Sequence, residues 1–314
     1  MRPLRIAIIG FGKIAADQHV PSIAANPRLE LAATSSRTGA GPEPSFTDWR
    51  ELLRSVPDLD AVSITTPPSV RYEIARECLG AGLHCMLEKP PSVGLSEIHD
   101  LACLAEAKGL TLQTTWHSQH NPAVNRAAEL LAGKRIAAME VRWQEDVHKW
   151  HPGQQWIFEP GGFGVFDPGI NAFSILTKIL PGPLFVKSAD LRFPSNADSP
   201  VAADVIFSSP AADGPMTCAL DFLRKDGEDW TIAIHTADGR AIRLEQGGSR
   251  LFVDEVEWSP AAETAALYGE YPELYREFVD LIDERRSLVD VAPLRLVADC
   301  FLLANRSEAE PIYM

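Results

Sequence analysis

Cysteine is scarce in this chain of 314 residues, and none of its five cysteines forms a Cys-x-x-Cys pair. Because the count is odd and the spacings are irregular, neither a disulfide framework nor a structural zinc site is expected. The metalloprotease pattern His-Glu-x-x-His is also absent. We therefore expect buried free thiols, no bound metal and the reducing environment of the cytoplasm.

Basic residues are in deficit, with 29 Lys and Arg against 43 Asp and Glu, for a net charge of −14. This balance disfavours sequence-independent binding to nucleic acid, which needs a basic surface. No polybasic segment suggests a membrane surface. The apolar run Leu4–Ile9 is too short to span a bilayer or to form a signal peptide. We expect small-molecule partners, with no nucleic acid and no membrane.

The first 118 residues alternate short apolar runs with longer amphipathic segments, which predicts a parallel sheet with helices on both faces. The expected strands are Leu4–Ile9, Leu29–Thr34, Ala61–Thr65, His84–Leu87 and Thr111–Thr115. The expected helices are Ile14–Ala25, Trp49–Ser55, Val70–Ala81 and Leu95–Ala107.

After Asn121 strand candidates follow one another without helices between them, which favours an antiparallel or mixed sheet. We therefore predict an α/β protein with two domains, residues 1–118 and 119–314. The second contains a polar loop, Asp146–Gly164, before a helix at Pro168–Leu180. Its expected strands are Ile136–Gln144, Leu184–Phe193, Val201–Phe207, Met216–Leu223, Trp230–Thr236 and Ala241–Glu245, and its last helices are Pro272–Glu284 and Pro293–Ala304.

A glycine-rich turn, Gly10-x-Gly12-x-x-Ala15, follows the first strand and opens the first helix. Gly10 permits the tight turn, Gly12 lets the backbone approach a pyrophosphate, and Ala15 allows close packing of helix and strand. Lys13 and Ile14 begin the helix, whose N–H groups favour phosphate. This arrangement predicts a Rossmann domain that binds a dinucleotide.

The second strand ends in Ser36-Arg37, without the carboxylate that many NAD enzymes place on the ribose 2′-hydroxyl. Ser36 and Arg37 can instead hold a 2′-phosphate, so we expect NADP, with NAD accepted second. Thr65, Thr66 and Pro67 follow another strand, where they would line the ribose at the ligand-binding edge of the sheet.

Two further segments contain candidate catalytic groups. Glu88-Lys89-Pro90 ends a strand on the same sheet edge, and its prolines restrict the positions open to Lys89. Asp167 precedes Pro168 and is expected to be a helix N-cap. Asn171 lies one turn later, on the same side as Asp167.

Aromatic and polar residues crowd the segment before that helix, including Trp143, Glu145, Trp150 and His151. Glu145 follows an apolar strand face, where a carboxylate is costly without a partner. Carboxylates, histidine and tryptophan together suit the hydroxyl rim and apolar faces of a sugar. His117, after the fifth strand, is a further candidate, although a lone histidine at such a place is more often structural than catalytic.

Jointly these motifs resemble the glucose–fructose oxidoreductase/inositol dehydrogenase (Gfo/Idh/MocA) family, and the resemblance covers essentially the whole chain. It implies a Rossmann domain with a parallel sheet, plus a C-terminal α/β domain with an open mixed, mainly antiparallel sheet that mediates homodimers or homotetramers. The motifs that carry it are Gly10-x-Gly12-x-x-Ala15, Glu88-Lys89-Pro90, Gly161–Asn171 and Pro293–Asp299.

Within the family the chain further resembles bacterial L-arabinose/D-galactose 1-dehydrogenases, through the segments Thr115–Ser118, Arg142–Asp146, Trp150–Trp156 and Phe166–Asn171. The likeness implies catalytic roles for Lys89, Asp167 and Asn171. It also implies a substrate site of His117, Glu145, Trp150, His151 and Trp230, and a cofactor site of Gly10, Gly12, Lys13, Ile14, Ser36, Arg37, Thr65, Thr66, Pro67, Glu88 and Lys89.

We therefore expect an NADP-preferring aldose 1-dehydrogenase that oxidises the anomeric carbon of a pyranose to the aldonolactone. Lys89 and Asp167, from different domains, must then converge on one reacting centre. Two alternatives remain. An inositol-type polyol dehydrogenase is disfavoured because those enzymes have a histidine where this chain has Asn171, and an amide cannot relay a proton. A dinucleotide-sensing regulator without chemistry is the other.

Overall fold

The computed structural model describes residues 2–259 and 269–314, and these form two compact units. The first unit comprises Met1–Trp116 together with Glu270–Val291, and the second comprises His117–Gly269 together with Ala292–Met314. The chain therefore leaves the first unit after Trp116 and returns to it for one helix. Among the described residues no helix is long and apolar enough to cross a membrane.

The sheet of the first unit has six strands, all parallel, in the order β3-β2-β1-β4-β5-β6. This is the Rossmann order, and it brings the carboxyl ends of β1, β4 and β5 to one edge. The strands are β1 (Leu4–Ile9), β2 (Leu29–Ser35), β3 (Ser45–Phe46), β4 (Ala61–Ile64), β5 (His84–Leu87) and β6 (Leu112–Thr114).

The first helix does not run as the single helix expected from the sequence. It begins as a wide π-turn, η1 (Ala15–His19), in which the N–H of Val20 donates to the carbonyl of Ala15, five residues earlier. An α-helix, α1 (Val20–Ala25), follows. Pro21 has no N–H and cannot continue the ladder, which explains the change of pitch. The remaining helices are α2 (Trp49–Ser55), α3 (Pro68–Gly80) and α4 (Leu95–Lys108).

A helix from late in the sequence completes the first unit. Helix α8 (Glu270–Asp283) packs on α1, and its residues Tyr275, Phe278 and Val279 join the same buried cluster as Ile6 and Ile8 of β1. All five side chains are 3% exposed or less. The apolar face of β1 is thus covered by residues about 270 positions away, and hydrophobic burial of this kind holds the unit together.

The sheet of the second unit has nine strands in the order β14-β13-β12-β11-β7-β10-β9-β8-β15. Only the β7–β10 and β8–β15 pairs are parallel, so the sheet is mixed and mainly antiparallel. The strands are β7 (Ile136–Gln144), β8 (Phe185–Pro194), β9 (Ala202–Ser208), β10 (Met216–Asp221), β11 (Asp229–Thr236), β12 (Ala241–Glu245), β13 (Arg250–Val253), β14 (Val256–Trp258) and β15 (Ala304–Ala309).

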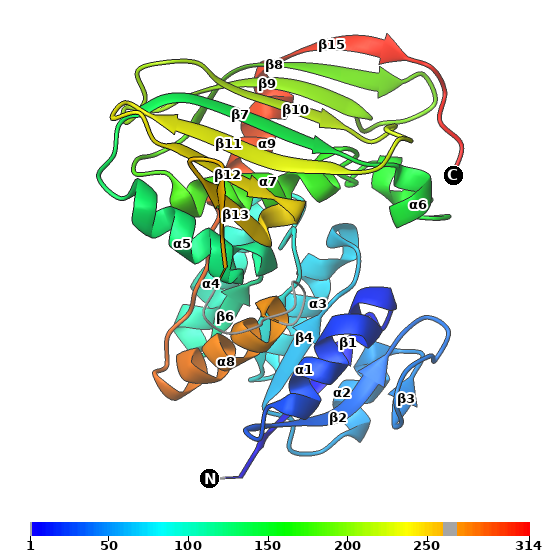
Figure 1. Ribbon diagram of the computed structural model, residues 1–314. Helices are drawn as coiled ribbons and strands as arrows, with labels where there is room; N and C mark the ends of the chain where they lie inside the picture. The colour runs from blue at the N-terminus through cyan, green and yellow to red at the C-terminus, as the bar shows by residue number, and fades with distance from the viewer. Residues whose placement is uncertain (1, 260–268) are drawn as a thin grey trace. The chain divides into compact units, whose positions relative to one another are not determined.

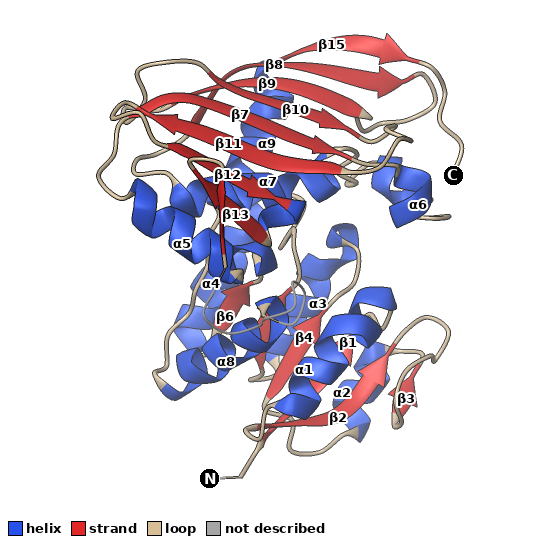
Figure 2. Ribbon diagram, viewed as in Figure 1, coloured by secondary structure: helices blue, strands red, loops and turns tan. Residues whose placement is uncertain are grey.

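Helices cover one face of this sheet, as Figures 1 and 2 show. They are α5 (Pro122–Leu131), α7 (Phe166–Ile179) and α9 (Ala292–Leu303), which contact one another through α7. Side chains of β8 and β9 alternate between buried and exposed, as in a sheet with one face open to solvent. Short helical turns complete the unit: η2 (His117–His120), α6 (Val147–Trp150), η3 (Gln155–Phe158) and η4 (Gln246–Gly248).

The predicted fold class is confirmed, and the differences lie in short elements. The segment expected to be a polar loop before α7 contains α6 and η3. Helix α5 was missed, although Asn121 caps it by accepting from the N–H of Ala123 at 3.2 Å and Pro122 follows as its first residue. Four strands of six residues or fewer were also not expected from the sequence: β3, β13, β14 and β15.

Candidate active site in two parts

The glycine turn after β1 has the geometry that a dinucleotide-binding loop requires. Gly10 has φ +100°, and a Cβ added to it would lie 2.6 Å from the backbone nitrogen of Thr66. Its carbonyl accepts from Thr65 Oγ1 at 2.8 Å, which joins the turn to the end of β4. Any side chain at Gly10 would therefore both strain the backbone and separate the two strand ends.

The same turn leaves room and polar groups for a pyrophosphate. A Cβ at Gly12 would meet nothing closer than 3.8 Å, and Thr66 Oγ1 is buried without a hydrogen-bond partner among the described residues. Lys13 is exposed and pairs with Asp17, one turn along η1. These features fit a dinucleotide phosphate against the first turn of the helix.

The residues expected to select NADP lie at the end of β2. Ser36 Oγ donates to the carbonyl of Ala40 at 3.1 Å, and its N–H donates to Phe46, so the turn is fixed by its own backbone. Arg37 is exposed and has no ion-pair partner among the described residues. Its guanidinium is therefore available to an anion from solvent.

Lys89 follows β5 and is half-buried, while its neighbour Glu88 is 4% exposed. The N–H of Lys89 donates to Glu88 Oε2 at 2.8 Å. Arg71 of α3, itself 2% exposed, donates to the carbonyls of Glu88, Pro90 and Thr66. One buried guanidinium thus joins the carboxyl ends of β4 and β5 around the lysine, which the sequence analysis did not foresee.

In the second unit, Asp167 and Asn171 lie on α7, but Asp167 is not its N-cap. The helix begins at Phe166 after Val165, whose side chain makes no capping bond. Asp167 is therefore the second residue of the helix, and its carboxylate, 4% exposed, is directed elsewhere. Gly164, with φ +52°, precedes the helix, and a Cβ there would come within 2.2 Å of the carbonyl of Pro200.

The Asp167 carboxylate instead faces His151. Asp167 Oδ2 lies 3.7 Å from His151 Nε2, and Glu145 Oε1 lies 3.9 Å from the same nitrogen. Glu145 Oε2 accepts from Trp230 Nε1 at 2.8 Å. Two buried carboxylates therefore flank one imidazole, and Glu145 has the kind of partner that a buried carboxylate requires. Glu145 follows β7 and His151 follows α6, while Asp167 lies on α7 and Trp230 on β11.

Aromatic rings surround the cluster. Trp230 stacks on Trp143 with ring centroids 6.2 Å apart. Trp150 lies tilted against Trp230, with ring centroids 5.4 Å apart. Trp150 is 42% exposed and donates from Nε1 to Glu228 Oε1 at 3.0 Å. Phe222 lies edge-on to His151 at 5.6 Å. Glu228 and Phe222 were not predicted, because neither belongs to a motif.

His117 begins η2, which contacts α7, the helix of Asp167 and Asn171. Gln119 Nε2 donates to the carbonyl of Ser174 at 2.9 Å, and Lys178 of α7 donates to the carbonyl of Gln119. Both bonds fasten η2 to α7 through one residue, Gln119. His117 is therefore held by the element that contains the two predicted catalytic residues of this unit.

His120, at the end of η2, predicts a pH-dependent stability. Burial lowers its pKa to about 4 from 6.5, and the charges of Lys178 and His117 add to the effect. As the pH falls below 6.5, the unfolded chain binds a proton at His120 before the folded chain does. The free energy of unfolding is therefore unaffected by His120 above pH 6.5 and decreases as the pH falls toward 4. We expect it to decrease by roughly 3 kcal/mol. Denaturant unfolding at pH 7 and pH 4.5 should show a smaller difference for His120→Asn than for wild type.

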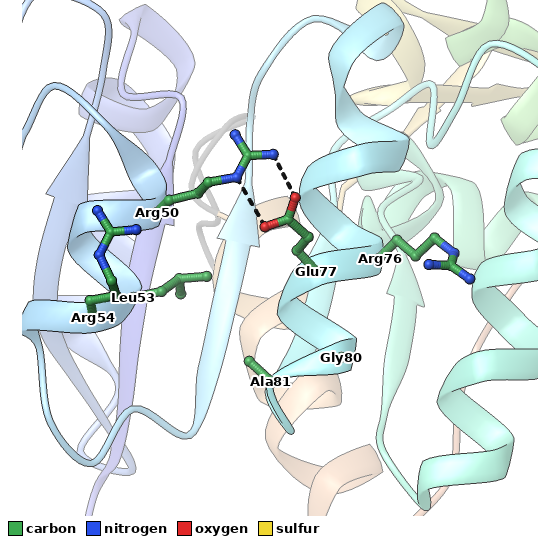
Figure 3. Close-up of a pocket in the computed structure, with 7 residues that line it drawn as sticks. All are labelled: Arg50, Leu53, Arg54, Arg76, Glu77, Gly80 and Ala81. Atoms are coloured by element: carbon green, nitrogen blue, oxygen red, sulfur yellow. Dashed lines mark hydrogen bonds and ion pairs between the residues drawn. The ribbon is translucent and has the colours of Figure 1, made fainter.

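A separate hollow of about 410 Å³ lies in the first unit, between α2 and α3. There Arg50 pairs with Glu77 at 2.5 Å, and Figure 3 shows the two side chains directed at each other across the hollow. None of the predicted site residues lines it. In the described part of the chain no group of three or more His, Cys, Asp or Glu residues could hold a metal ion.

The structure thus gathers the predicted residues in two groups. Within the first unit, the strand ends bring together Gly10, Thr65, Thr66, Glu88 and Lys89. Within the second, Glu145, Trp150, His151, Asp167 and Trp230 form one cluster, while Asn171 lies half-buried one turn along α7 from Asp167. The first group fits a dinucleotide, and the second offers carboxylates, an imidazole and indole rings to a polar substrate.

Comparison with known proteins finds relatives over the whole length of the chain. Residues 4–116 match the model of the Gfo/Idh/MocA oxidoreductase family, NAD-binding Rossmann fold. A galactose 1-dehydrogenase of Pseudomonas fluorescens is 42% identical over 315 residues, which cover 100% of both chains. The crystal structure of a D-galactose-1-dehydrogenase protein from Rhizobium etli has a TM-score of 0.91 and 45% identity, covering 100% of this chain and 99% of that one.

A more distant structure shares the fold alone. The 3-ketoreductase of Actinomadura kijaniata, crystallised with TDP-benzene and NADP, has a TM-score of 0.81 at 17% identity. The match covers 98% of this chain and 100% of that one.

Proposed function

Since the chain belongs to the Gfo/Idh/MocA oxidoreductase family, we propose that it is an NADP-preferring aldose 1-dehydrogenase. The substrate would be a pyranose of the D-galactose, L-arabinose or D-fucose type, and the product its aldonolactone. The observation that carries the proposal is the full-length identity of 42% to 45% with proteins named as galactose 1-dehydrogenases. The carboxylate, imidazole and indole cluster of the second unit suits a sugar.

When bound, NADP would supply the acceptor for the hydride that leaves the anomeric carbon of the sugar. As this hydride leaves, residues of the chain must remove the proton of the C1 hydroxyl. Lys89 would stabilise the developing alkoxide with its ammonium group. Asp167 would accept the proton, directly or through Lys89. Asn171, which can only donate or accept hydrogen bonds, would orient the sugar.

The remaining polar residues would select and hold the sugar. Glu145 and His151 can bind ring hydroxyls, while His117 can bind another. Trp150 and Trp230 offer ring faces to the apolar side of a pyranose. We further propose a cytoplasmic homodimer or homotetramer formed through the open face of the nine-stranded sheet.

Cofactor choice is tested by reversing one charge. Arg37→Asp should lower the kcat/KM ratio of NADP over NAD by roughly 10- to 100-fold, because a charge-assisted contact to the 2′-phosphate is lost and a repulsive one is gained. Arg54→Asp makes the same charge change on an exposed residue of α2 (Figure 3) and should leave the ratio unaltered. An unchanged ratio in Arg37→Asp would remove that residue from cofactor selection.

Substrate class is tested by NADP reduction with D-galactose, L-arabinose, D-fucose, D-xylose and myo-inositol. We expect turnover with the first three, which share the configuration from C2 to C4, and release of a lactone. Turnover confined to myo-inositol would favour a polyol dehydrogenase. Retained NADP binding without turnover of any sugar would favour a regulator.

A further inference from the structure

A buried polar network lies beneath Lys89 in the first unit, built around the carboxylate of Glu88. Glu88 Oε1 is 3.1 Å from His19 Nε2 and accepts from Tyr271 at 2.9 Å. His19 Nδ1 in turn lies 2.7 Å from the hydroxyl of Tyr275 and 3.1 Å from Ser63 Oγ. Every member is 4% exposed or less. The network therefore links η1, β4, β5 and α8 without bulk water.

The network satisfies a carboxylate that would otherwise be costly to bury. Glu88 Oε2 accepts a hydrogen bond from the backbone N–H of Lys89 at 2.8 Å. The carboxylate therefore contacts His19, Tyr271 and Lys89. An ionised carboxylate only accepts hydrogen bonds, so His19 donates from Nε2 whenever Glu88 is ionised. Burial, followed by the charge of Glu88, raises the pKa of Tyr271 well above its ordinary value. Tyr271 is thus a permanent donor.

Two sequence features deliver these groups. The π-turn η1, which ends before Pro21, presents His19 to the end of β5. Helix α8 supplies both tyrosines, whose rings stand edge-on to His19 with centroids 5.0 and 5.7 Å away. Neither the π-turn nor a helix from late in the sequence belongs to a plain strand–turn–helix motif. Both bring hydrogen-bonding side chains to the Glu88 carboxylate and so restrict its position.

From this geometry we infer that His19, Tyr271 and Tyr275 are positioning residues for Lys89. They fix the Glu88 carboxylate, which fixes the backbone N–H of Lys89, while Arg71 fixes the carbonyls on either side. The lysine then approaches the substrate from a rigid base. This inference rests on the proposed function, in which Lys89 stabilises the alkoxide. A displacement of about 1 Å in such a group costs about 10²-fold in rate.

Tyrosine-to-phenylalanine variants test the inference with little change of volume. Tyr271→Phe should lower kcat by about 10- to 100-fold, while KM for the sugar and Kd for NADPH stay within about threefold of wild type. Tyr275→Phe should lower kcat less, since it acts one bond further away. Tyr72→Phe is the matched control, because it removes a tyrosine bond to Asp100 in the same unit, on the half-exposed pair of α3 and α4.

A second measurement separates this inference from the proposed function. Lysines are ¹³C-dimethylated, and the Lys89 resonance is identified by its loss in Lys89→Arg. Its chemical shift in the NADP complex should change in Tyr271→Phe and stay unchanged in Tyr72→Phe. If wild type oxidises no aldose, the proposed function fails and this resonance alone decides the inference. An unmoved resonance, or a kcat within twofold of wild type, would overturn the positioning role.

Discussion

Lys89→Met should reduce kcat by at least about 10³-fold while leaving the Kd for NADPH within about threefold of wild type. Methionine keeps much of the length and volume of the side chain but removes the ammonium that would stabilise the alkoxide. Losing one preorganised donor of this kind costs about 10²- to 10³-fold, and loss of the charge adds to it. Single-turnover reduction of NADP, with fluorescence titration of NADPH, gives both quantities.

The matched control is Lys108→Met, which removes an exposed lysine at the end of α4 in the first unit. It should leave kcat unaltered. Near-normal turnover in Lys89→Met would show that the chemistry proceeds without this ammonium, and the mechanism above would have to be abandoned.

Asp167→Asn should lower kcat by about 10²- to 10⁴-fold, the range typical of a lost general base. The amide has the same shape as the carboxylate, so the contact with His151 can persist and α7 should remain in place. Asp213→Asn, which weakens an exposed ion pair with Arg135 in the turn between β9 and β10, is the control and should have almost no effect. A kcat within tenfold of wild type would point to a different proton acceptor.

The double variant Lys89→Met/Asp167→Asn tests whether the lysine ammonium and the aspartate carboxylate act in the same step of the reaction. Residues that act as a unit are strongly non-additive. We therefore expect the double variant to be about as slow as Lys89→Met alone. Fully multiplicative losses would indicate that the lysine and the aspartate serve separate events.

The sequence predicted the regular elements well where burial governs the pattern. Strands β1, β5, β7 and β12 and helix α2 agree to the residue with the expected ranges. Strand β15 was not predicted, and its composition explains why. Its residues Ala304–Ala309 are mostly exposed and lack β-branched side chains, and they form a strand only because β8 offers a parallel edge. Tertiary pairing of that sort leaves no periodic signal in the sequence.

The residues of the candidate site also fall into those that a local motif predicts and those that only the tertiary structure brings in. Residues within compact motifs, such as Gly10, Lys89 and Asp167, could be predicted because each motif has a local physical reason. The partners of Glu88 could not, since Tyr271 lies 183 residues away in sequence and no pattern links the two. The expected N-cap role of Asp167 was wrong because α7 starts at Phe166, two residues before the expected start at Pro168.

The return of the chain to its first unit at α8 has a practical consequence for dissecting this enzyme. A fragment ending near Trp116 would contain all of the Gfo/Idh/MocA family match but would lack Tyr275, Phe278 and Val279, and would expose Ile6 and Ile8 to water. Chimeras that exchange the nucleotide-binding half at a single crossover would inherit the same defect. Only a graft that transfers α8 as well carries an intact half.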